Sequence, residues 1–267
     1  MSIDPLLASQ LKDKYNAEGT VLRRAQLKML EMLIFIDTIC KKNNLTYWLD
    51  GGTLLGAVRH GGFIPWDDDT DICMPAKDAE KFKHIMLTEY SNTDFALQCK
   101  ETDNGYFGAW YILRDKNSEY IQNSKLHNKR QYRGLQVDIF IVEDQVNDVF
   151  WNFSLLYQKV IDKLLNTSNS LFFSTIFVKP LYHVFHSFLI PLFRITSKRN
   201  VFYKMPYGSV WKFKLNKESI YPLSQCTFEK YDFCIPGNYD QYLKTEFGNW
   251  QNIPQNIWNH QATIVLK

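Results

Sequence analysis

The chain has 267 residues, of which 45% are hydrophobic and 15% aromatic, so it is long enough to bury a sizeable core and too apolar to be disordered. Its formal charge of +3 is small and its 31 basic residues are dispersed, which excludes nucleic acid as the expected partner. Small anionic ligands and an anionic membrane surface remain compatible with this charge. We expect a single catalytic domain over residues 1–267.

The predicted elements come from hydrophobic periodicity and from turn residues. In chain order they are a helix at 20–42, a strand at 45–49, a Gly51-Gly52 turn, a short helix at 53–60, a strand at 67–74, a helix at 76–90, and strands at 95–100, 109–114 and 135–142. Strands and helices in this order predict an α+β fold, in which a mixed sheet is flanked by helices.

Residues 147–201 are predicted to form an aromatic-rich helical insertion. Within them, 171–195 are mostly apolar but contain two prolines, a lysine and two histidines. We expect these residues to interrupt any membrane-spanning helix, which needs ~20 unbroken apolar residues. Two interpretations stay open: a pair of short helices in a membrane interface with basic residues facing lipid phosphates, or a helical hairpin packed on the core.

The five cysteines are odd in number and show no C-x-x-C spacing. We therefore expect neither a disulfide framework nor a zinc site, and a reducing, cytoplasmic compartment fits best. The first residues lack a basic start followed by an apolar run, so no signal peptide is expected.

Four aspartates lie close together between residues 67 and 71, next to apolar residues. Asp69 and Asp71 are two apart in the predicted strand, so their side chains point the same way. Asp138 lies in another apolar strand, LQVDIFIV, where a carboxylate needs a partner. Three acids from two strands predict a site for a hard divalent cation, Mg²⁺ with Mn²⁺ as the alternative. A helix cap or a buried salt bridge is the simpler explanation of Asp138.

The Gly51-Gly52-Thr53 turn supplies the complementary half of this site. Glycines let a backbone approach a ligand closely, and the N-terminus of the following helix offers free N–H groups to an anion. Thr53 adds a hydroxyl. Arg59 and His60 end that helix and are candidates for neutralising a phosphate, although a surface histidine is an equally good interpretation of His60.

Two stretches carry a resemblance to a known family: WLDGGTLLGAVRH at 48–60 and IPWDDDTD at 64–71. Over about 25 positions they resemble the LicD/fukutin-related family of phosphocholine and polyol-phosphate transferases. This family is a branch of the polymerase-beta-like nucleotidyltransferase superfamily, which is defined by a G-G-[ST] turn and three acidic residues. Later stretches at 113–116, 134–140, 239–244 and 247–250 resemble the family less sharply, and 147–201 do not.

The resemblance implies a polymerase-beta-like nucleotidyltransferase fold and a metal-dependent phosphotransferase. Its donor is CDP-choline or a similar CDP-activated compound, and its acceptor is a sugar hydroxyl of a glycan, lipopolysaccharide or lipid-linked sugar. In this scheme Asp69, Asp71 and Asp138 are the catalytic, metal-binding acids, and Gly51 and Gly52 belong to the diphosphate site.

Trp66 is a candidate for packing on the nucleotide or on a choline head group, with an ordinary core position as the alternative. The expected location is cytoplasmic, with peripheral contact at the inner face of the membrane. Two other functions stay open: transfer of the nucleotidyl group itself to a small molecule, and a non-catalytic membrane-bound accessory protein. The roles of Asp67, Asp68, Arg114, Arg133 and His260 are left unassigned.

Overall fold

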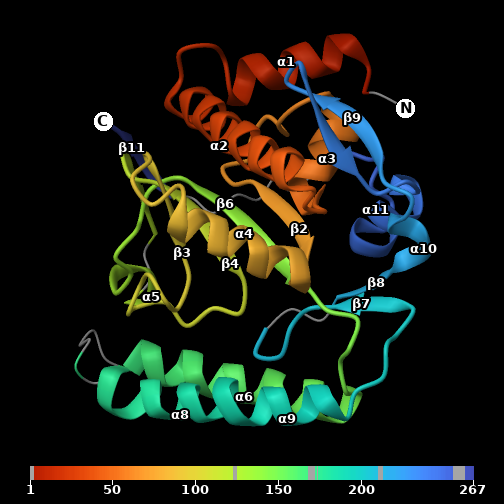
Figure 1. Cartoon of the computed structure of the whole chain (residues 1–267). Helices are drawn as coiled ribbons and strands as arrows, with labels where there is room; N and C mark the ends of the chain where they lie inside the picture. The colour runs from red at the N-terminus through yellow and green to blue at the C-terminus, as the bar shows by residue number, and fades with distance from the viewer. Residues whose placement is uncertain (1–2, 123–124, 168–171, 173, 210–212, 255–261) are drawn as a thin grey trace.

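The computed structural model describes residues 3–122, 125–167, 172, 174–209, 213–254 and 262–267 (Figure 1). A five-stranded sheet lies at its centre, in the order β1-β2-β6-β4-β3. Its strands are β1 Trp48–Leu49, β2 Asp71–Pro75, β3 Phe95–Gln98, β4 Tyr111–Asp115 and β6 Gln136–Val142. Because β2 and β6 are parallel and the other neighbours antiparallel, the predicted mixed sheet and the α+β class are confirmed.

The long helix predicted at 20–42 is α2, Val21–Asn43. It begins at Thr20, whose hydroxyl accepts a hydrogen bond from the Arg23 N–H, and it ends at Asn44, which has the left-handed conformation (φ 52°). The residues of its predicted apolar face are buried in the main core, among them Met29 and Ile36. The helix at 76–90 is confirmed as α4, Ala76–Thr88, and both helices pack on the sheet.

Three boundaries differ from the prediction. The strand at 45–49 contracts to β1, and the short helix α3, Gly51–His60, begins inside the expected turn. The strand expected at 67–74 starts only at Asp71, so Asp69 lies in the preceding loop and the premise that both acids belong to one strand was wrong. A Thr70 carbonyl still accepts from the Asp138 N–H at 2.8 Å, which holds the loop against β6.

Smaller elements surround this sheet, and the sequence prediction named none of them. Three two-stranded sheets pair β5 with β11, β7 with β8, and β9 with β10. Their strands are β5 Ser118–Ile121, β7 Phe202–Lys204, β8 Lys214–Asn216, β9 Ser224–Phe228, β10 Tyr231–Ile235 and β11 Thr263–Leu266. The remaining short helices on this side are α1 Pro5–Tyr15, α5 Lys125–Asn128, α10 Lys217–Ile220 and α11 Tyr239–Phe247.

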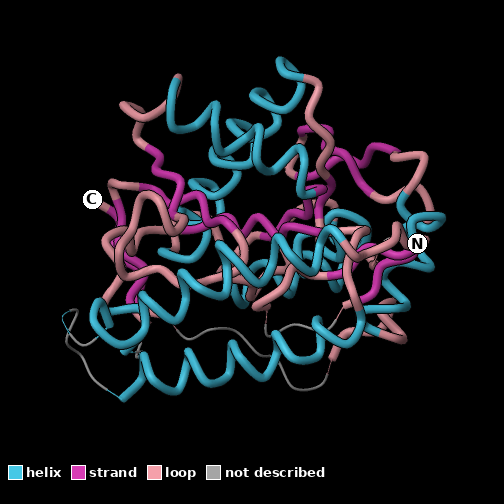
Figure 2. Tube along the Cα trace, turned by 60° about the horizontal axis from the view of Figure 1, so that its bottom comes forward, coloured by secondary structure: helices cyan, strands magenta, loops and turns pink. Residues whose placement is uncertain are grey.

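A helical hairpin forms a separate layer beside the sheet domain (Figures 1 and 2). Its first helix is α6, Asp148–Thr167. Its second is a continuous helical run made of η1 Ser174–Val178, α8 Lys179–Val184, η2 Phe185–Leu189 and α9 Ile190–Ile195. The hairpin has its own aromatic core, in which Phe150 stacks on Phe193 at 3.9 Å between ring centroids. Helices lie where the aromatic-rich helical region was predicted, and its status as an insertion stays a prediction.

The prolines of the second helix do not interrupt it, contrary to expectation. Pro180 and Pro191 each follow a π-helical stretch and occupy the first turn of the next α-helical piece. A proline lacks an N–H and its ring crowds the carbonyl four residues earlier, and a wider π-turn relieves both conflicts. Within the described residues the run Ile176–Ile195 is long and apolar enough to cross a membrane by length and composition, and 22% of it is buried.

Candidate functional site

The two glycines of the predicted turn form the first turn of α3 and face carboxylates. Gly51 has φ 51°, and a Cβ built on it would lie 2.9 Å from Asp71 Oδ2. A Cβ on Gly52 would lie 2.6 Å from Asp67 Oδ2. No side chain fits at either position without displacing an acid, so these glycines let the positive end of the helix come close to the carboxylates.

Thr53 joins the two halves of the site. Its side chain is buried, and its Oγ1 accepts a hydrogen bond from the Asp71 N–H at 2.8 Å. The bond fixes the first turn of α3 against the first residue of β2. Binding of a ligand by the threonine hydroxyl, which can still donate its proton, stays a prediction.

The acidic group contains more aspartates than the sequence predicted. One carboxylate oxygen from each of Asp67, Asp68 and Asp69 lies within 4.8 Å of the other two. Asp68 is buried and accepts a hydrogen bond from the Tyr120 hydroxyl at 3.2 Å. The two acids that the sequence left unassigned therefore belong to the same cluster as Asp69.

Asp71 and Asp138 are directly opposite each other, because β2 and β6 pair in parallel with these residues in register. Asp138 accepts from the Trp110 indole N–H at 3.1 Å and from the Gln136 amide at 3.0 Å. Burial raises the pKa of Asp138 to about 6. Burial raises the pKa of Asp71 well above its usual value, and the charges of Asp69 and Asp138 raise it further.

This donor set fits a divalent cation. The available ligand atoms are carboxylate oxygens, the type that Mg²⁺ and Mn²⁺ prefer. The raised pKa of Asp71 reflects burial and mutual repulsion, and a bound cation would offset both. Among basic residues, Arg114 has the largest electrostatic effect on the pKa of Asp138, which it lowers. Its guanidinium nevertheless donates to the Gln98 side chain and the Gly134 carbonyl and not to a carboxylate.

A buried network behind the glycine turn was missed by the sequence analysis. Asp50 precedes Gly51 and is buried, and it accepts hydrogen bonds from the Tyr242 hydroxyl at 2.5 Å and the Cys73 thiol at 3.2 Å. Tyr242 in turn accepts from the Trp48 indole at 3.1 Å. An aspartate directly before the two glycines was the local signal for this position, but its partner lies in α11, far along the chain.

The other predicted ligand-binding residues lie at the opposite end of α3. Arg59 donates to the carbonyls of Trp250 at 2.8 Å and Asn252 at 3.0 Å, and to His60 Nε2 at 3.0 Å. These bonds tie α3 to the chain after α11. Trp66 is buried, edge to face with the rings of Tyr15 and His60. Binding of phosphate or nucleotide by these three residues stays a prediction.

The remaining unassigned residues are widely separated. Arg133 is exposed after α5, and its carbonyl accepts a hydrogen bond from the Tyr120 N–H. Arg114 is fully buried, and burial lowers its pKa to about 10. His260 lies outside the described residues.

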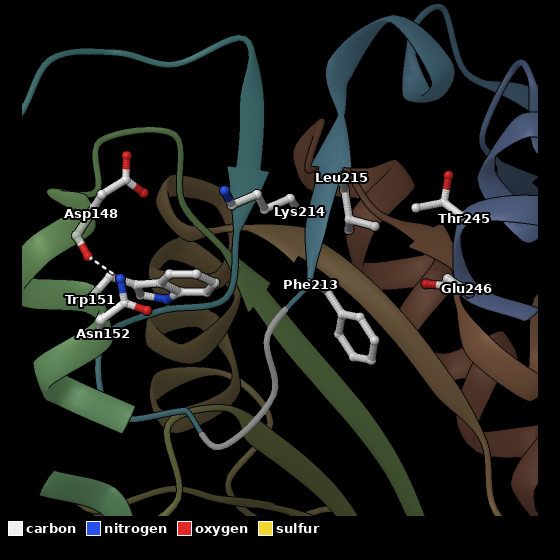
Figure 3. Close-up of a pocket in the computed structure, with 8 residues that line it drawn as sticks. All are labelled: Asp148, Trp151, Asn152, Phe213, Lys214, Leu215, Thr245 and Glu246. Atoms are coloured by element: carbon white, nitrogen blue, oxygen red, sulfur yellow. Dashed lines mark hydrogen bonds between the residues drawn. The ribbon is translucent and has the colours of Figure 1, made fainter. Parts of the chain in front are cut away.

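Two hollows lie near the hairpin. One of about 410 Å³ lies between α6, β8 and α11 (Figure 3). The other, of about 730 Å³, runs from the ends of β2 and β6 to the second hairpin helix. We call this larger hollow the hairpin cleft. Trp110 lines it and also donates to Asp138, so one wall residue of the cleft contacts the acidic group, although no acid of that group lines the cleft.

The fold and the site together define an α+β protein in which a glycine-rich helix N-terminus faces a cluster of carboxylates. A family model described as "LicD/FKTN/FKRP, nucleotidyltransferase domain" matches residues 44–152, which contain the glycine turn and all the acids of this site. The resemblance to the LicD family seen in the sequence is confirmed over these residues.

Individual relatives match shorter segments. Over 68 residues, 26% of each chain, this sequence is 43% identical to the lipopolysaccharide cholinephosphotransferase LicD of Haemophilus influenzae. Over 55 residues, 21% of this chain and 11% of the relative, it is 43% identical to the human ribitol 5-phosphate transferase FKRP. An uncharacterized Rickettsia prowazekii protein is 26% identical over 161 residues, 54% of this chain and 59% of the relative. The matches therefore span less than two thirds of these relatives.

Proposed function

We propose that this chain is a metal-dependent phosphotransferase. It transfers phosphocholine, or a related phospho-alcohol, from a CDP-activated donor to a sugar hydroxyl of a cell-surface glycan or lipopolysaccharide. The observation that carries the proposal is the first turn of α3, which faces the carboxylates of Asp67 and Asp71 and is fixed there by the 2.8 Å hydrogen bond from the Asp71 N–H to Thr53 Oγ1. The Haemophilus relative is a cholinephosphotransferase and the human relative is a ribitol 5-phosphate transferase, and these activities support the reaction class.

Each part of the site has a role in this proposal. The N–H groups of Gly51 and Gly52 bind the donor diphosphate at the positive end of α3, and the Thr53 hydroxyl adds a donor. Asp69, Asp71 and Asp138 hold the cation, with Asp67 and Asp68 beside them. The cation supplies charge neutralisation at the phosphates, and the protein supplies positioning.

The acceptor sugar binds in the hairpin cleft. Aromatic side chains line this cleft and polar groups lie between them, a composition suited to the faces and hydroxyls of a sugar. The Trp110 indole lies between the cleft and Asp138, to which it donates, so in this proposal a movement of Trp110 would bring an acceptor hydroxyl to the acidic group. As the alternative to holding the cation, Asp138 takes the acceptor proton, a role that suits its pKa of about 6 in the metal-free chain.

For location, we propose a cytoplasmic enzyme at the inner face of the membrane. There it meets both a soluble CDP-activated donor and a growing glycan. The apolar helix Ile176–Ile195 supports this location.

One further activity has a specific observation in its favour. The matching family model carries the description "nucleotidyltransferase domain", which suits transfer of the nucleotidyl group itself. Both reactions use the same cation and the same diphosphate contacts, and they differ in the phosphorus atom that is attacked.

A donor labelled at two positions separates these reactions. The protein is incubated with Mg²⁺, a lipopolysaccharide acceptor, and CDP-choline that carries ³H in choline and ¹⁴C in cytidine. Phosphotransfer places ³H on the acceptor and releases ¹⁴C as CMP. Transfer of ¹⁴C to the acceptor would establish the nucleotidyl reaction instead, and transfer of neither label from any CDP donor would favour an accessory protein.

The donor head group is identified by thermal denaturation. Bound ligand stabilises the folded state, by ~2.7 kcal/mol at a hundred times the Kd. The protein is heated with CDP-choline, CDP-ethanolamine, CDP-glycerol or CDP-ribitol, each with and without Mg²⁺. We expect the largest rise in Tm with CDP-choline and only when Mg²⁺ is present.

A further inference from the structure

The outer face of the hairpin carries an apolar stripe on each helix. On α6 the stripe follows steps of four, three and four residues: Val149, Phe153, Leu156 and Val160. On the second helix it consists of Ile176, Phe177, Leu181, Val184, Phe188, Leu192 and Ile195. These eleven side chains are between 42% and 84% exposed. A soluble monomer rarely exposes so many large apolar groups together, so this face has a partner.

On the opposite sides of the two helices, aromatic side chains pack against one another in the hairpin core. Tyr157 stacks on Phe185 at 3.7 Å, and Phe150 stacks on Phe193 at 3.9 Å. The hairpin core of buried residues also includes Trp151 and Ile161. The exposed stripes are therefore a second apolar face on helices that already have a packed one. Figures 1 and 2 show no described element covering the outer side of the hairpin.

Charge identifies the partner. Residues 148–199 contain six basic and two acidic residues, a formal +4, whereas the whole chain is only +3 and the remainder is therefore −1. Lys159 and Lys163 are exposed on α6, and Lys198 and Arg199 are exposed after the second helix. A second copy of this face would bring these four exposed cations against four more. An anionic surface complements it, at ~1 kcal/mol for each lysine or arginine near the headgroups.

We propose that this face docks the enzyme on an anionic lipid bilayer, with the hairpin lying in the plane of the membrane. The stripes enter the boundary between headgroups and acyl chains, and the basic side chains contact lipid phosphates. The proposal rests on the proposed function only in giving a membrane location to that enzyme. It adds the surface, the orientation and the lipid charge.

The contacts of the second helix decide between lying on the membrane and crossing it. Arg194 forms an ion pair with the buried Glu143, and Lys179 donates to Asn104 at 3.0 Å. The neighbouring helix α6 carries Lys159, Asp162 and Lys163, which are costly in hydrocarbon. If Ile176–Ile195 crossed the membrane, the contacts of Arg194 and Lys179 would be broken. The charged side chains of α6 would also be placed in or beside hydrocarbon. The hairpin therefore stays on the membrane surface.

This orientation places the hairpin cleft beside the lipid. Tyr182, His186 and Arg194 belong to the second helix and also line the cleft. These side chains are on the face of the helix opposite the stripe, so one helix separates the cleft from the lipid. The docking surface and the acceptor site share one helix.

Vesicle flotation with the full chain tests the proposal. Binding is measured to vesicles of phosphatidylcholine alone and of phosphatidylcholine with 30% phosphatidylglycerol, at 50 and 500 mM NaCl. We expect binding to the anionic vesicles that weakens at high salt. Phe153→Ser and Phe188→Ser should each reduce it roughly tenfold, because about half of a phenylalanine side chain loses its apolar environment. Lys159→Glu with Lys163→Glu should reduce it similarly.

Leu6→Ser is the matched control, since Leu6 is 69% exposed on α1 at a distance from the hairpin in the fold. It should bind vesicles like the native chain. Equal binding by native chain, Phe153→Ser and Phe188→Ser would overturn the proposal. So would a dimer, detected by sedimentation, that Phe188→Ser dissociates. Transfer to a water-soluble sugar acceptor should be unchanged in Phe153→Ser and Phe188→Ser. If the native chain transferred nothing to the water-soluble acceptor, the proposed function would be refuted. Vesicle binding would then still decide whether the hairpin face is a docking surface.

Discussion

The acidic group and the hairpin face break opposite rules of protein architecture. Around Asp71 and Asp138, carboxylates are buried together, although charged groups are normally solvated. On α6 and the second hairpin helix, large apolar side chains are exposed, although such groups normally lie inside. In the functions proposed above, each region is completed from outside the chain: by a cation and phosphates in the first, and by lipid in the second. The chemistry of the mismatch indicates the chemistry of the partner.

Removing one charge from the acidic group tests the first half of this contrast most strongly. Asp71→Asn should lower transfer roughly 10³-fold or more, because a cation ligand is lost. The Tm measured without metal should stay equal or rise, since one repelling charge is gone. Both are measured on purified protein by labelled-donor assay and thermal denaturation.

Asp13→Asn makes the same chemical change at an exposed acid of α1 and should alter neither quantity. An Asp71→Asn protein that lost stability in proportion to its lost activity would indicate a structural acid and not a cation ligand.

Crowding at the glycine turn is the next test. Gly51→Ala adds two costs, backbone strain at φ 51° and a Cβ that would lie 2.9 Å from the Asp71 carboxylate. Gly61→Ala adds only the first, since Gly61 has φ 68° with open space around its Cβ position at the other end of α3. We expect kcat/KM to fall at least about tenfold further in Gly51→Ala than in Gly61→Ala. Equal losses would leave backbone strain as the whole explanation.

Thr53→Val removes the acceptor of the Asp71 N–H while keeping the side-chain shape. An unsatisfied buried N–H costs ~1–3 kcal/mol, so the free energy of unfolding should fall by about that amount. Urea denaturation measures it. Thr53→Ser keeps the hydroxyl and should retain most of this stability, and equal stability of Thr53→Val and the native chain would show that the bond is replaced by water.

The smallest expected effect comes from the hairpin, at His186. Burial lowers the pKa of His186 to about 3, and the positive charges of Lys100 and Arg194 lower it further. An unfolded histidine titrates near 6.5, so below that pH the unfolded state binds more protons and stability falls toward pH 3. His186→Gln should reduce the loss of unfolding free energy between pH 7 and pH 6 by about 0.7 kcal/mol. His183→Gln, at an exposed position on the same helix, should leave the pH dependence unchanged.

Local patterns carried most of the prediction for the sheet and the site. The period of α2 and the turn and acids of residues 51–71 are short-range features, and each was found from neighbouring residues. The start of β2 was missed because four aspartates and a threonine give no strand boundary. The continuity of the second hairpin helix was missed because prolines usually end helices, and the π-turns that accommodate them have no clear sequence signal.

The Asp50 network was out of reach for a different reason. Its hydroxyl donor, Tyr242, is 192 positions away in the sequence, and only the fold brings α11 beneath the glycine turn. Cluster membership of Asp67 and Asp68 likewise depends on how a loop turns and not on strand alternation. The tertiary fold decides these contacts, and the hydrophobic periodicity of the sequence does not encode them.

The Tyr242 contact also limits how far this catalytic unit can be treated as a module. The family match ends at residue 152, yet the wall behind Gly51 is completed by α11, and Arg59 is held by carbonyls of Trp250 and Asn252. A fragment cut at the end of the match would leave Asp50 with a buried carboxylate and no hydroxyl to bind it. Transplanting the motif into another protein therefore requires the C-terminal helix as well, and the functional unit is discontinuous in sequence.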